Sequence, residues 1–333
     1  MVKLTRAPDW QRLARLGKEA LDLAANSLKP ATRKAYQADW DQFALWCESN
    51  GIDSLPAEPA AICLYIAEIQ HKLKVSSITR ALTSIGVIHA LKGLENPVKT
   101  PQVKTVLTGL KKKKGMRPDK ATPIGFADLQ KMISLCPPSM VGLRDAAILA
   151  IGWGGALRRA EICALNFRDL ALSSEGIAVT IRQSKNDPQG RGRVVAIPRA
   201  PKGRFCLVSK IENWIDRLEK SRSKGDKTQA IFRRLGSQGR QFFSAVGPRL
   251  SPRSVALIVS KYAALVGLHG DFSGHSLRRG LATEAARAGA PQWAIKQHTG
   301  HASSDQLNEY IEAGRLFIDS PLLPILQSPG KRS

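Results

Sequence analysis

The sequence has 333 residues, of which 43% are hydrophobic and 23% are charged, a composition that excludes disorder as the main state of the chain. Lysine and arginine number 51 against 27 acidic residues, so the net charge is +24, with +9 on residues 1–120 and +15 on the rest. Positive charge along the whole chain favours a polyanion such as nucleic acid as the partner. No stretch approaches the roughly 18 uninterrupted apolar residues of a membrane span. The basic N-terminus has no apolar signal segment, so we expect a cytoplasmic protein without a membrane partner.

The first 120 residues predict a small helical bundle. Aromatic residues recur there at helical spacing, beginning with Tyr36, Trp40 and Phe43. The predicted helices cover residues 36–47, 61–69, 78–89 and 103–110. The stretch 35–70 has six acidic residues and no lysine or arginine, so we expect it to face away from DNA or to dock a basic surface of a neighbouring protomer.

Four consecutive lysines mark the end of this bundle. They are followed by Gly115 and Arg117-Pro118, and like charges that end in glycine and proline are typical of a linker, although a solvated helix end has the same composition. We therefore divide the chain into a basic extension, a helical DNA-binding domain, a basic linker and a second domain, at residues 1–26, 27–114, 115–121 and 122–333. The residues expected to bind DNA at this hinge are Lys111, Lys112, Lys113, Lys114 and Arg117.

Residues 122–333 predict a mainly helical domain with one small sheet. Two β-branched runs, 177–181 and 193–197, flank a segment rich in turn residues, so we expect a hairpin with Lys185 at its mobile tip. Further helices are expected at residues 205–220, 254–266, 277–288 and 291–299. The predicted fold class is therefore mainly α with a small β-sheet or hairpin, in two domains.

Metals and other cofactors are not expected. The five cysteines are scattered, without a Cys-x-x-Cys pair or a Cys/His ligand set, and we expect them to pack as small hydrophobic residues. The sequence has no apparent carboxylate cluster for Mg²⁺ and no glycine-rich phosphate loop, so we predict chemistry that needs neither a metal nor ATP.

Four short motifs in the second domain combine into a candidate site. They are Arg158-x-x-Glu161, the hairpin Lys185, His275-x-x-Arg278, and Gly300-His301 with Tyr310 nine residues later. Each motif alone is commonplace, because ion pairs on helices, solvated lysines, structural histidines and half-buried aromatic residues occur in most proteins. Together they contain every group that phosphodiester chemistry requires.

The chemical argument concerns the transfer of a phosphoryl group. Two guanidiniums hold both non-bridging oxygens through planar forks, and they replace a metal as the source of positive charge. A histidine exchanges protons near neutral pH, and a tyrosine is a covalent nucleophile once its proton is removed. A lysine on a mobile loop suits protonation of the leaving 5′-oxygen.

The order of these motifs resembles the tyrosine recombinase (phage integrase) family, in a Cre-like or Xer-like form. The similarity is most specific over residues 274–310 and extends more loosely over the helical domain from about residue 27. It implies a C-shaped clamp, made of a helical core-binding domain and a mixed α/β catalytic domain, on double-stranded DNA with inverted-repeat sites. Thr299 departs from the leucine that the family usually has there, a difference that we expect to affect packing rather than chemistry.

The resemblance implies roles for the residues that contact the phosphate. Tyr310 attacks the scissile phosphate and forms a 3′-phosphotyrosyl enzyme with a free 5′-hydroxyl. Arg158 and Arg278 clamp the phosphate oxygens. His275 acts as general base or proton shuttle beside the tyrosine, and His301 donates a hydrogen bond to the phosphate.

The resemblance implies supporting roles for the other motif residues. Lys185 is the expected general acid, with Arg191 and Arg193 as competing candidates close by. Glu161 is expected to orient the site by holding a neighbouring arginine or histidine. Arg279, the second arginine of the H-x-x-R motif, is expected to bind DNA.

The apolar tail over residues 316–326 has two interpretations. It packs on its own domain, or, as the resemblance implies, it docks into a neighbouring subunit and links four protomers in a ring on two DNA duplexes. We predict a site-specific recombinase that exchanges strands through a Holliday junction. The alternatives are a type IB topoisomerase and a non-catalytic DNA-binding regulator with the same fold.

Overall fold

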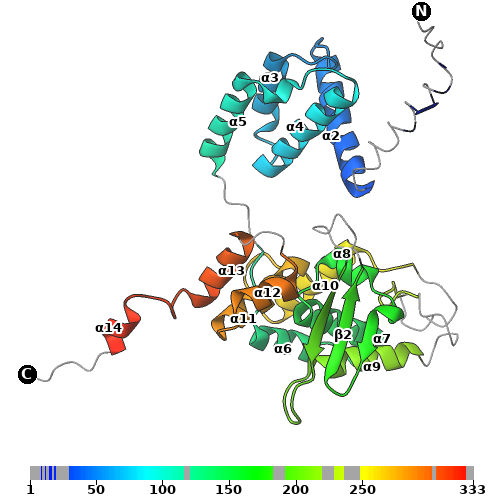
Figure 1. Cartoon of the computed structure of the whole chain (residues 1–333), viewed down its shortest axis with the longest axis vertical. Coiled ribbons are helices and arrows are strands. Elements are labelled where there is room, and N and C mark those ends of the chain that lie inside the picture. Colours follow the sequence, from blue (N-terminus) through cyan, green and yellow to red (C-terminus); the bar gives the residue numbers. More distant parts are fainter. Residues whose placement is uncertain are drawn as a thin grey trace, which may run out of the picture. The chain divides into compact units, whose positions relative to one another are not determined.

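The computed structural model describes residues 30–115, 121–182, 192–219, 229–235, 248–301 and 305–327, together with Asp9, Arg12, Arg15, Leu16 and Glu19. The chain forms two compact units, Met1–Pro118 and Asp119–Ser333 (Figure 1). Several residues of interest lie outside the described part of the chain, namely Arg117, Lys185 with the rest of the hairpin tip, Arg191 and most of the extension 1–26.

Within its described residues, the first unit is a bundle of four α-helices with one 3₁₀ turn. Its elements are α2 (Pro30–Ser49), α3 (Pro59–Ile69), α4 (Val75–Leu91), η1 (Pro97–Lys99) and α5 (Pro101–Lys114). Proline begins α3, η1 and α5, because its fixed φ suits the first helical turn and the N–H that it lacks has no helical partner there. Phe43, Ile62, Ile78 and Val103, one from each helix, are fully buried in a shared core.

The run of four lysines forms the last turn of α5, so of its two interpretations the structure shows the helix end, and the expected linker bounds 115–121 lie beyond it. Cations are favourable at this place because they offset the helix dipole, and Gly115 follows the helix with φ of +76°. The Nζ of Lys114 donates to the carbonyl of Gln70 and, at 3.0 Å, to that of Leu73, at the end of α3. Lys114 therefore holds two helices of the bundle together, whereas Lys112 and Lys113 are exposed.

The acidic stretch 35–70 is partly neutralised within the bundle. The carboxylate of Asp39 is nearly buried and accepts two hydrogen bonds from Arg80 of α4, at 2.7 and 2.9 Å. This geometry is the two-pronged fork that an arginine forms with a carboxylate. Asp39 therefore joins α2 to α4, and the orientation of the stretch toward DNA stays a prediction.

The second unit combines helices with one small sheet. Its helices are α6 (Phe126–Ser134), α7 (Met140–Gly154), α8 (Arg159–Ala164), η2 (Phe167–Asp169), α9 (Leu207–Glu219), α10 (Pro252–Leu265), α11 (Gly274–Arg287), α12 (Gln292–Thr299), α13 (Asp305–Arg315) and α14 (Leu323–Gln327). Twelve of the fifteen residues of α7 are buried, because other elements pack around this largely apolar helix, whose two charged residues, Arg144 and Asp145, form a buried ion pair. The spacing of apolar residues does not predict where such a helix begins and ends, because it has no continuous polar face.

The sheet contains one strand more than the predicted hairpin. Its strands are β1 (Leu170–Leu172), β2 (Gly176–Ile181) and β3 (Arg193–Pro198), all antiparallel, with β2 in the centre (Figure 1). Val179 pairs with Val195, and Ile177 with Ile197, on the buried face. Residues of a strand alternate between faces, so Arg193 lies on the same face as Val195 and Ile197.

A short segment at the start of the second unit lies along α11. The N–H of Thr122 donates to the carbonyl of Asp271 at 2.8 Å, and the N–H of Ile124 donates to that of Ser276 at 3.1 Å. Gly280 makes this approach possible, because a Cβ at that position would lie 1.9 Å from the carbonyl oxygen of Ile124. In the part of the chain that the structure describes, no helix is long and apolar enough to cross a membrane.

Candidate active site

The turn between α7 and α8 carries the first arginine of the site. Ala156 in this turn has φ of +48°, a strained conformation for a residue with a side chain, and Arg158 caps the start of α8. The backbone N–H of Arg158 donates to Oε2 of Glu161 at 2.9 Å, and its Nη1 donates to Oε1 at 2.8 Å. Glu161 is only 4% exposed, so one buried carboxylate fixes both the backbone and the side chain of Arg158.

Arg193 of β3 binds the same carboxylate from the other side. Its Nη1 and Nη2 donate to the two oxygens of Glu161 at 3.3 and 3.1 Å. Burial by itself raises the pKa of Glu161, but the hydrogen bonds and charges of Arg193 and Arg158 outweigh burial and lower this pKa to about 2. Glu161 is therefore ionised at neutral pH and orients two arginines. From the sequence, one of these, Arg193, was expected only as an alternative to Lys185 as the general acid.

Arg278 approaches this pair from the first turn of α11. It is 3% exposed, and its Nη1 donates to the carbonyl of the strained Ala156 at 2.9 Å. Its Nη2 is buried and has no hydrogen-bond partner among the residues that the structure describes. Burial and then the charge of Arg158 lower the pKa of Arg278 to about 9, although Glu161 opposes that shift. A buried guanidinium with an unused donor is costly unless it receives an anion, so this group points to an anion-binding site.

His301 and Tyr310 complete the cluster on its other side. Gly300 ends α12 in the left-handed conformation, with φ of +64°, and a Cβ there would lie 2.9 Å from Nε of Arg193. The ring of His301 is 5.6 Å from the ring of Tyr310, between centroids, at an interplanar angle of 58°. Burial and then the charges of Arg278 and other arginines lower the pKa of His301 to about 3. His301 is therefore a neutral imidazole at neutral pH.

The hydroxyl of Thr299 lies 2.8 Å from Nδ1 of His301. This departure from the family pattern therefore contacts a residue of the candidate site, and its expected effect on packing rather than chemistry stays a prediction. The preceding residue of α12, His298, places its Nε2 at 2.8 Å from the carbonyl of Gly154, the last residue of α7. Burial lowers the pKa of His298 as well. Two histidines, His298 at the end of α12 and His301 just after it, are thus tied into the site, and the sequence motifs identified only His301.

The remaining motif residues differ in their surroundings. His275 is an exposed residue of the first turn of α11, close enough to His301 for its charge to contribute to the low pKa of that residue. Arg279 donates from Nη1 to the carbonyl of Ala121 at 2.6 Å, and its Cζ is 5.1 Å from the ring centroid of Tyr310. Its predicted contact with DNA stays a prediction, but these two contacts bring Arg279 to the edge of the site.

The structure therefore brings Arg158, Glu161, Arg278, His301 and Tyr310 together and adds Arg193, His298, Thr299 and Arg279 around them. A signal for Arg193 is present in the sequence, because it shares strand alternation with the buried residues Val195 and Ile197. Within the described ranges, no three His, Cys, Asp or Glu side chains are grouped so that they could hold a metal ion. Three guanidiniums around one carboxylate leave the cluster positively charged.

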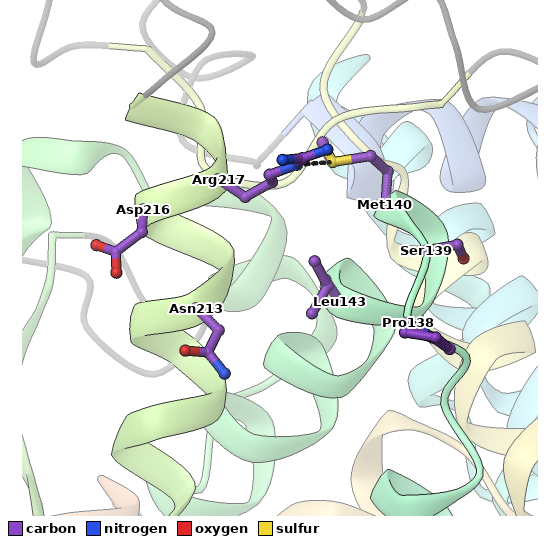
Figure 2. Close-up of a pocket in the computed structure, with 7 residues that line it drawn as sticks. All are labelled: Pro138, Ser139, Met140, Leu143, Asn213, Asp216 and Arg217. Carbon is purple, nitrogen blue, oxygen red and sulfur yellow. Dashed lines mark hydrogen bonds between the residues drawn. The ribbon is translucent and has the colours of Figure 1, made fainter.

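A separate pocket lies between the start of α7 and one side of α9 (Figure 2). Its volume is about 490 Å³, and Nε of Arg217 donates to the sulfur of Met140 at its rim, at 3.3 Å. The lining residues are Pro138, Ser139, Met140, Leu143, Asn213, Asp216 and Arg217. None of them belongs to the cluster of arginines and histidines, so this pocket is not part of the candidate active site.

Known proteins with similar sequences and structures were compared with the chain. A model of the phage integrase family matches residues 124–315. The chain is 33% identical over 327 residues to an integrase/recombinase XerD homologue of Selenomonas ruminantium, which covers 97% of this chain and 92% of that protein. It is 27% identical over 285 residues to the recombinase Cre of Escherichia phage P1, which covers 81% of this chain and 80% of Cre.

A solved structure shares the fold. It is a lambda integrase dimer bound to a COC′ core site, with a TM-score of 0.58 and 15% identity over 90% of this chain and 94% of that one. The family model covers more than half of the chain, and the relative from Selenomonas ruminantium spans nearly all of it. The chain therefore belongs to the phage integrase family, whose members are tyrosine recombinases.

Proposed function

We propose that this protein is a site-specific DNA recombinase that cleaves and rejoins strands through a 3′-phosphotyrosyl intermediate. One observation carries the proposal: a buried, positively charged cluster lies beside Tyr310, and in it Nη2 of Arg278 has no partner among the described residues. A phosphodiester supplies the anion that this cluster lacks, at a place where a tyrosine can reach phosphorus. The membership of the chain in the tyrosine recombinases supports the same assignment.

The chemical step starts from an intact phosphodiester. Arg158 and Arg278 bind the non-bridging oxygens and stabilise the charge that grows on them. The Tyr310 oxygen forms a bond to phosphorus as the bond to O5′ breaks, and its proton passes to an imidazole of the site. Lys185 protonates the departing O5′. The products are a 3′-phosphotyrosyl enzyme and a 5′-hydroxyl, so the energy of the broken bond is kept and rejoining needs no ATP.

The carboxylate of Glu161 prepares the cluster for this step. Two arginines already share it before DNA arrives, so their guanidiniums need little reorganisation when the phosphate binds. Arg193 therefore acts through Glu161 as a positioning residue, and its Nε packs against the Gly300 turn that carries His301.

The DNA partner follows from the charge of both parts of the chain. We assign the helical domain 27–114 and the linker 115–121 to DNA binding, with Lys111, Lys112, Lys113 and Arg117 on phosphates, and the domain 122–333 to catalysis. The lambda integrase dimer of the same fold is bound to a core site, which supports DNA as the partner, and we assign a duplex with two inverted arms as the target. Such a protein works in the cytoplasm, at the nucleoid.

Assembly on two duplexes is the remaining part of the proposal. Leu316, Phe317, Leu322 and Leu326 follow the tyrosine helix and are 61–83% exposed in a single chain. Exposed apolar side chains in a row indicate a surface that another protein covers. We assign this tail to the neighbouring subunit of a cyclic tetramer that exchanges strands through a Holliday junction.

A covalent trap tests the function. The protein and its Tyr310→Phe variant are incubated with fragmented host and plasmid DNA and denatured, and the DNA that stays attached is sequenced. We expect attachment through a 3′-phosphate that is lost in Tyr310→Phe and retained in the control Tyr36→Phe, whose tyrosine lies in the other unit. Recovered sites with paired inverted arms support a recombinase, whereas scattered sites indicate a topoisomerase. Tight binding without any adduct supports a non-catalytic regulator.

A further inference from the structure

The hydroxyl of Thr299 has two close partners that restrict its hydrogen. Thr299 is fully buried at the end of α12, and its Oγ1 lies 2.6 Å from the carbonyl oxygen of Ile295 and 2.8 Å from Nδ1 of His301. A carbonyl oxygen only accepts, so the single hydroxyl hydrogen belongs to the contact with Ile295, as is usual for threonine in a helix. The hydroxyl oxygen therefore accepts from His301, and Nδ1 is the protonated nitrogen.

The consequence concerns the other nitrogen of the same ring. A neutral imidazole carries one N–H, so Nε2 of His301 has a lone pair that can accept a proton. His301 is 7% exposed, and Arg158, Arg193, Arg278 and His275 surround it with charge that opposes a second proton. Its ring contacts that of Tyr310, whereas His275 is exposed.

We propose that Thr299 is a positioning residue that holds His301 as the Nδ1–H tautomer, so that Nε2 of His301 accepts the proton of Tyr310. The inference rests on the proposed function and names the base in it. During the attack the O–H bond of the tyrosine breaks, its proton moves to Nε2, and the phenolic oxygen bonds to phosphorus while O5′ leaves. The bound phosphate offsets the arginine charges, so the imidazolium becomes stable only with DNA present. Its new Nε2–H then donates to a non-bridging oxygen.

The tautomer can be observed in the whole chain by NMR of ¹⁵N-labelled histidines. Two histidines, the buried His89 and the partly buried His298, provide internal references of opposite type. His89 accepts from the N–H of Ala57 at Nε2 and donates from Nδ1 to a carbonyl, and His298 donates from Nε2 to the carbonyl of Gly154. The His301 signals, assigned by their loss in His301→Asn, are expected to follow the pattern of His89. A pattern like that of His298 in the unmodified protein overturns the inference.

Substitution of the threonine gives the functional test. Thr299→Val keeps the shape of the side chain and removes the hydroxyl, so His301 loses its preference for the Nδ1–H tautomer. We expect the rate of covalent adduct formation at saturating protein to fall about 10- to 100-fold, with unchanged affinity for DNA. Thr299→Ser retains the hydroxyl and restores the rate. The matched control is Thr283→Val, because the buried hydroxyl of Thr283 has no partner among the described residues.

The outcomes separate this inference from the function on which it rests. Loss of the adduct in Tyr310→Phe, together with equal rates for Thr299→Val and Thr283→Val, overturns the role of Thr299 and leaves the recombinase standing. An adduct that survives Tyr310→Phe overturns both. If Thr299→Val does not fold, the tautomer in the unmodified protein and the rate of Thr299→Ser still decide the question.

Discussion

At the scale of single residues, Glu161 determines the electrostatics of the site. Its carboxylate accepts hydrogen bonds from both Arg158 and Arg193, and all three side chains are largely buried. A buried ion pair contributes little net stability when intact, but removal of one partner leaves an uncompensated buried charge. The two arginines therefore depend on this carboxylate until a phosphate arrives.

Substitution Glu161→Gln tests this dependence. We expect the free energy of unfolding to fall by about 3–5 kcal/mol, as for other broken buried pairs, with slower adduct formation. Urea unfolding measures the first effect. The matched control is Glu212→Gln, which removes the carboxylate of a similar two-pronged pair with Arg199 at a more exposed position. A loss of stability no greater than that of the control would contradict the assigned role.

The lowered pKa values of His301 and His298 predict a dependence of stability on pH. The pKa of His301 is about 3 in the folded protein and about 6.5 in an unfolded chain, so only the unfolded state gains a proton as pH falls below 6.5. The free energy of unfolding is unaffected above that pH and decreases by up to about 1.4 kcal/mol per pH unit as the pH falls below it. His298, whose pKa is also lowered, acts in the same direction.

Urea unfolding between pH 4.5 and 7.5 measures this slope. The interval lies above the range in which Glu161 titrates. The low pKa of Glu161, about 2, means that its ionised form stabilises the fold above about pH 4.5, and this contribution is lost as pH falls from there toward 2. We expect His301→Gln to have a shallower slope than the unmodified protein below pH 6.5. Parallel curves for the two proteins would show that His301 is not held neutral by the fold.

At the scale of elements, close contact with the backbone of Ile124 fixes the position of α11 in the second unit. A Cβ at Gly280 would lie 1.9 Å from the carbonyl oxygen of Ile124 and 2.9 Å from Nε1 of Trp153, which itself donates to that carbonyl. Backbone cannot yield to such a contact without moving the helix. Since Arg278 is on the same helix, this packing sets the position of a guanidinium in the site.

The substitution Gly280→Ala is therefore expected to destabilise the second unit by about 1–3 kcal/mol and to slow adduct formation. Gly109→Ala is the contrasting variant, because Gly109 is in the middle of α5 with nothing within 4 Å of an added Cβ. Helix propensity predicts that it stabilises the first unit by about 0.5–1 kcal/mol. Denaturation followed by circular dichroism distinguishes the two signs, and equal effects would contradict the packing argument.

Most elements follow from local pattern, and those that do not have physical reasons. Helical spacing predicted the helices of the first unit, although α2 begins six residues before the predicted range, and β-branched runs predicted the strands β2 and β3. Strand β1 has only three residues, too few for alternation to be recognised, and it exists because β2 offers it a partner. The lysine run had two interpretations in the sequence, a linker and a helix end. The structure shows the helix end, where the helix dipole and the carbonyls bound by Lys114 offset charge repulsion.

At the scale of the whole molecule, the exposed tail after α13 predicts a requirement for neighbouring subunits. Deletion of residues 316–333 removes the exposed apolar side chains but leaves Tyr310 and the arginine cluster in place. We expect weak DNA binding by single chains to persist, while complexes with two duplexes and recombination are lost.

Sedimentation of protein–DNA complexes and a plasmid recombination assay measure the two effects. The control is the substitution Leu257→Ala, which removes one exposed apolar side chain from α10, outside the tail. Recombination by the deletion variant at the unmodified rate would mean that the tail packs on its own domain or has no role in assembly.

The sequence by itself determined the charge of the protein, its mainly helical class and the types and order of its candidate catalytic residues. These properties depend on composition and on spacing within single helices. Only the tertiary structure decided which groups meet. Arg193 reaches Glu161 across 32 residues of chain, and the carbonyl of Gly154 meets His298 across 144. A hydrogen-bond network of this kind depends on how β3, α8, α11 and α12 pack, which spacing along the chain does not encode.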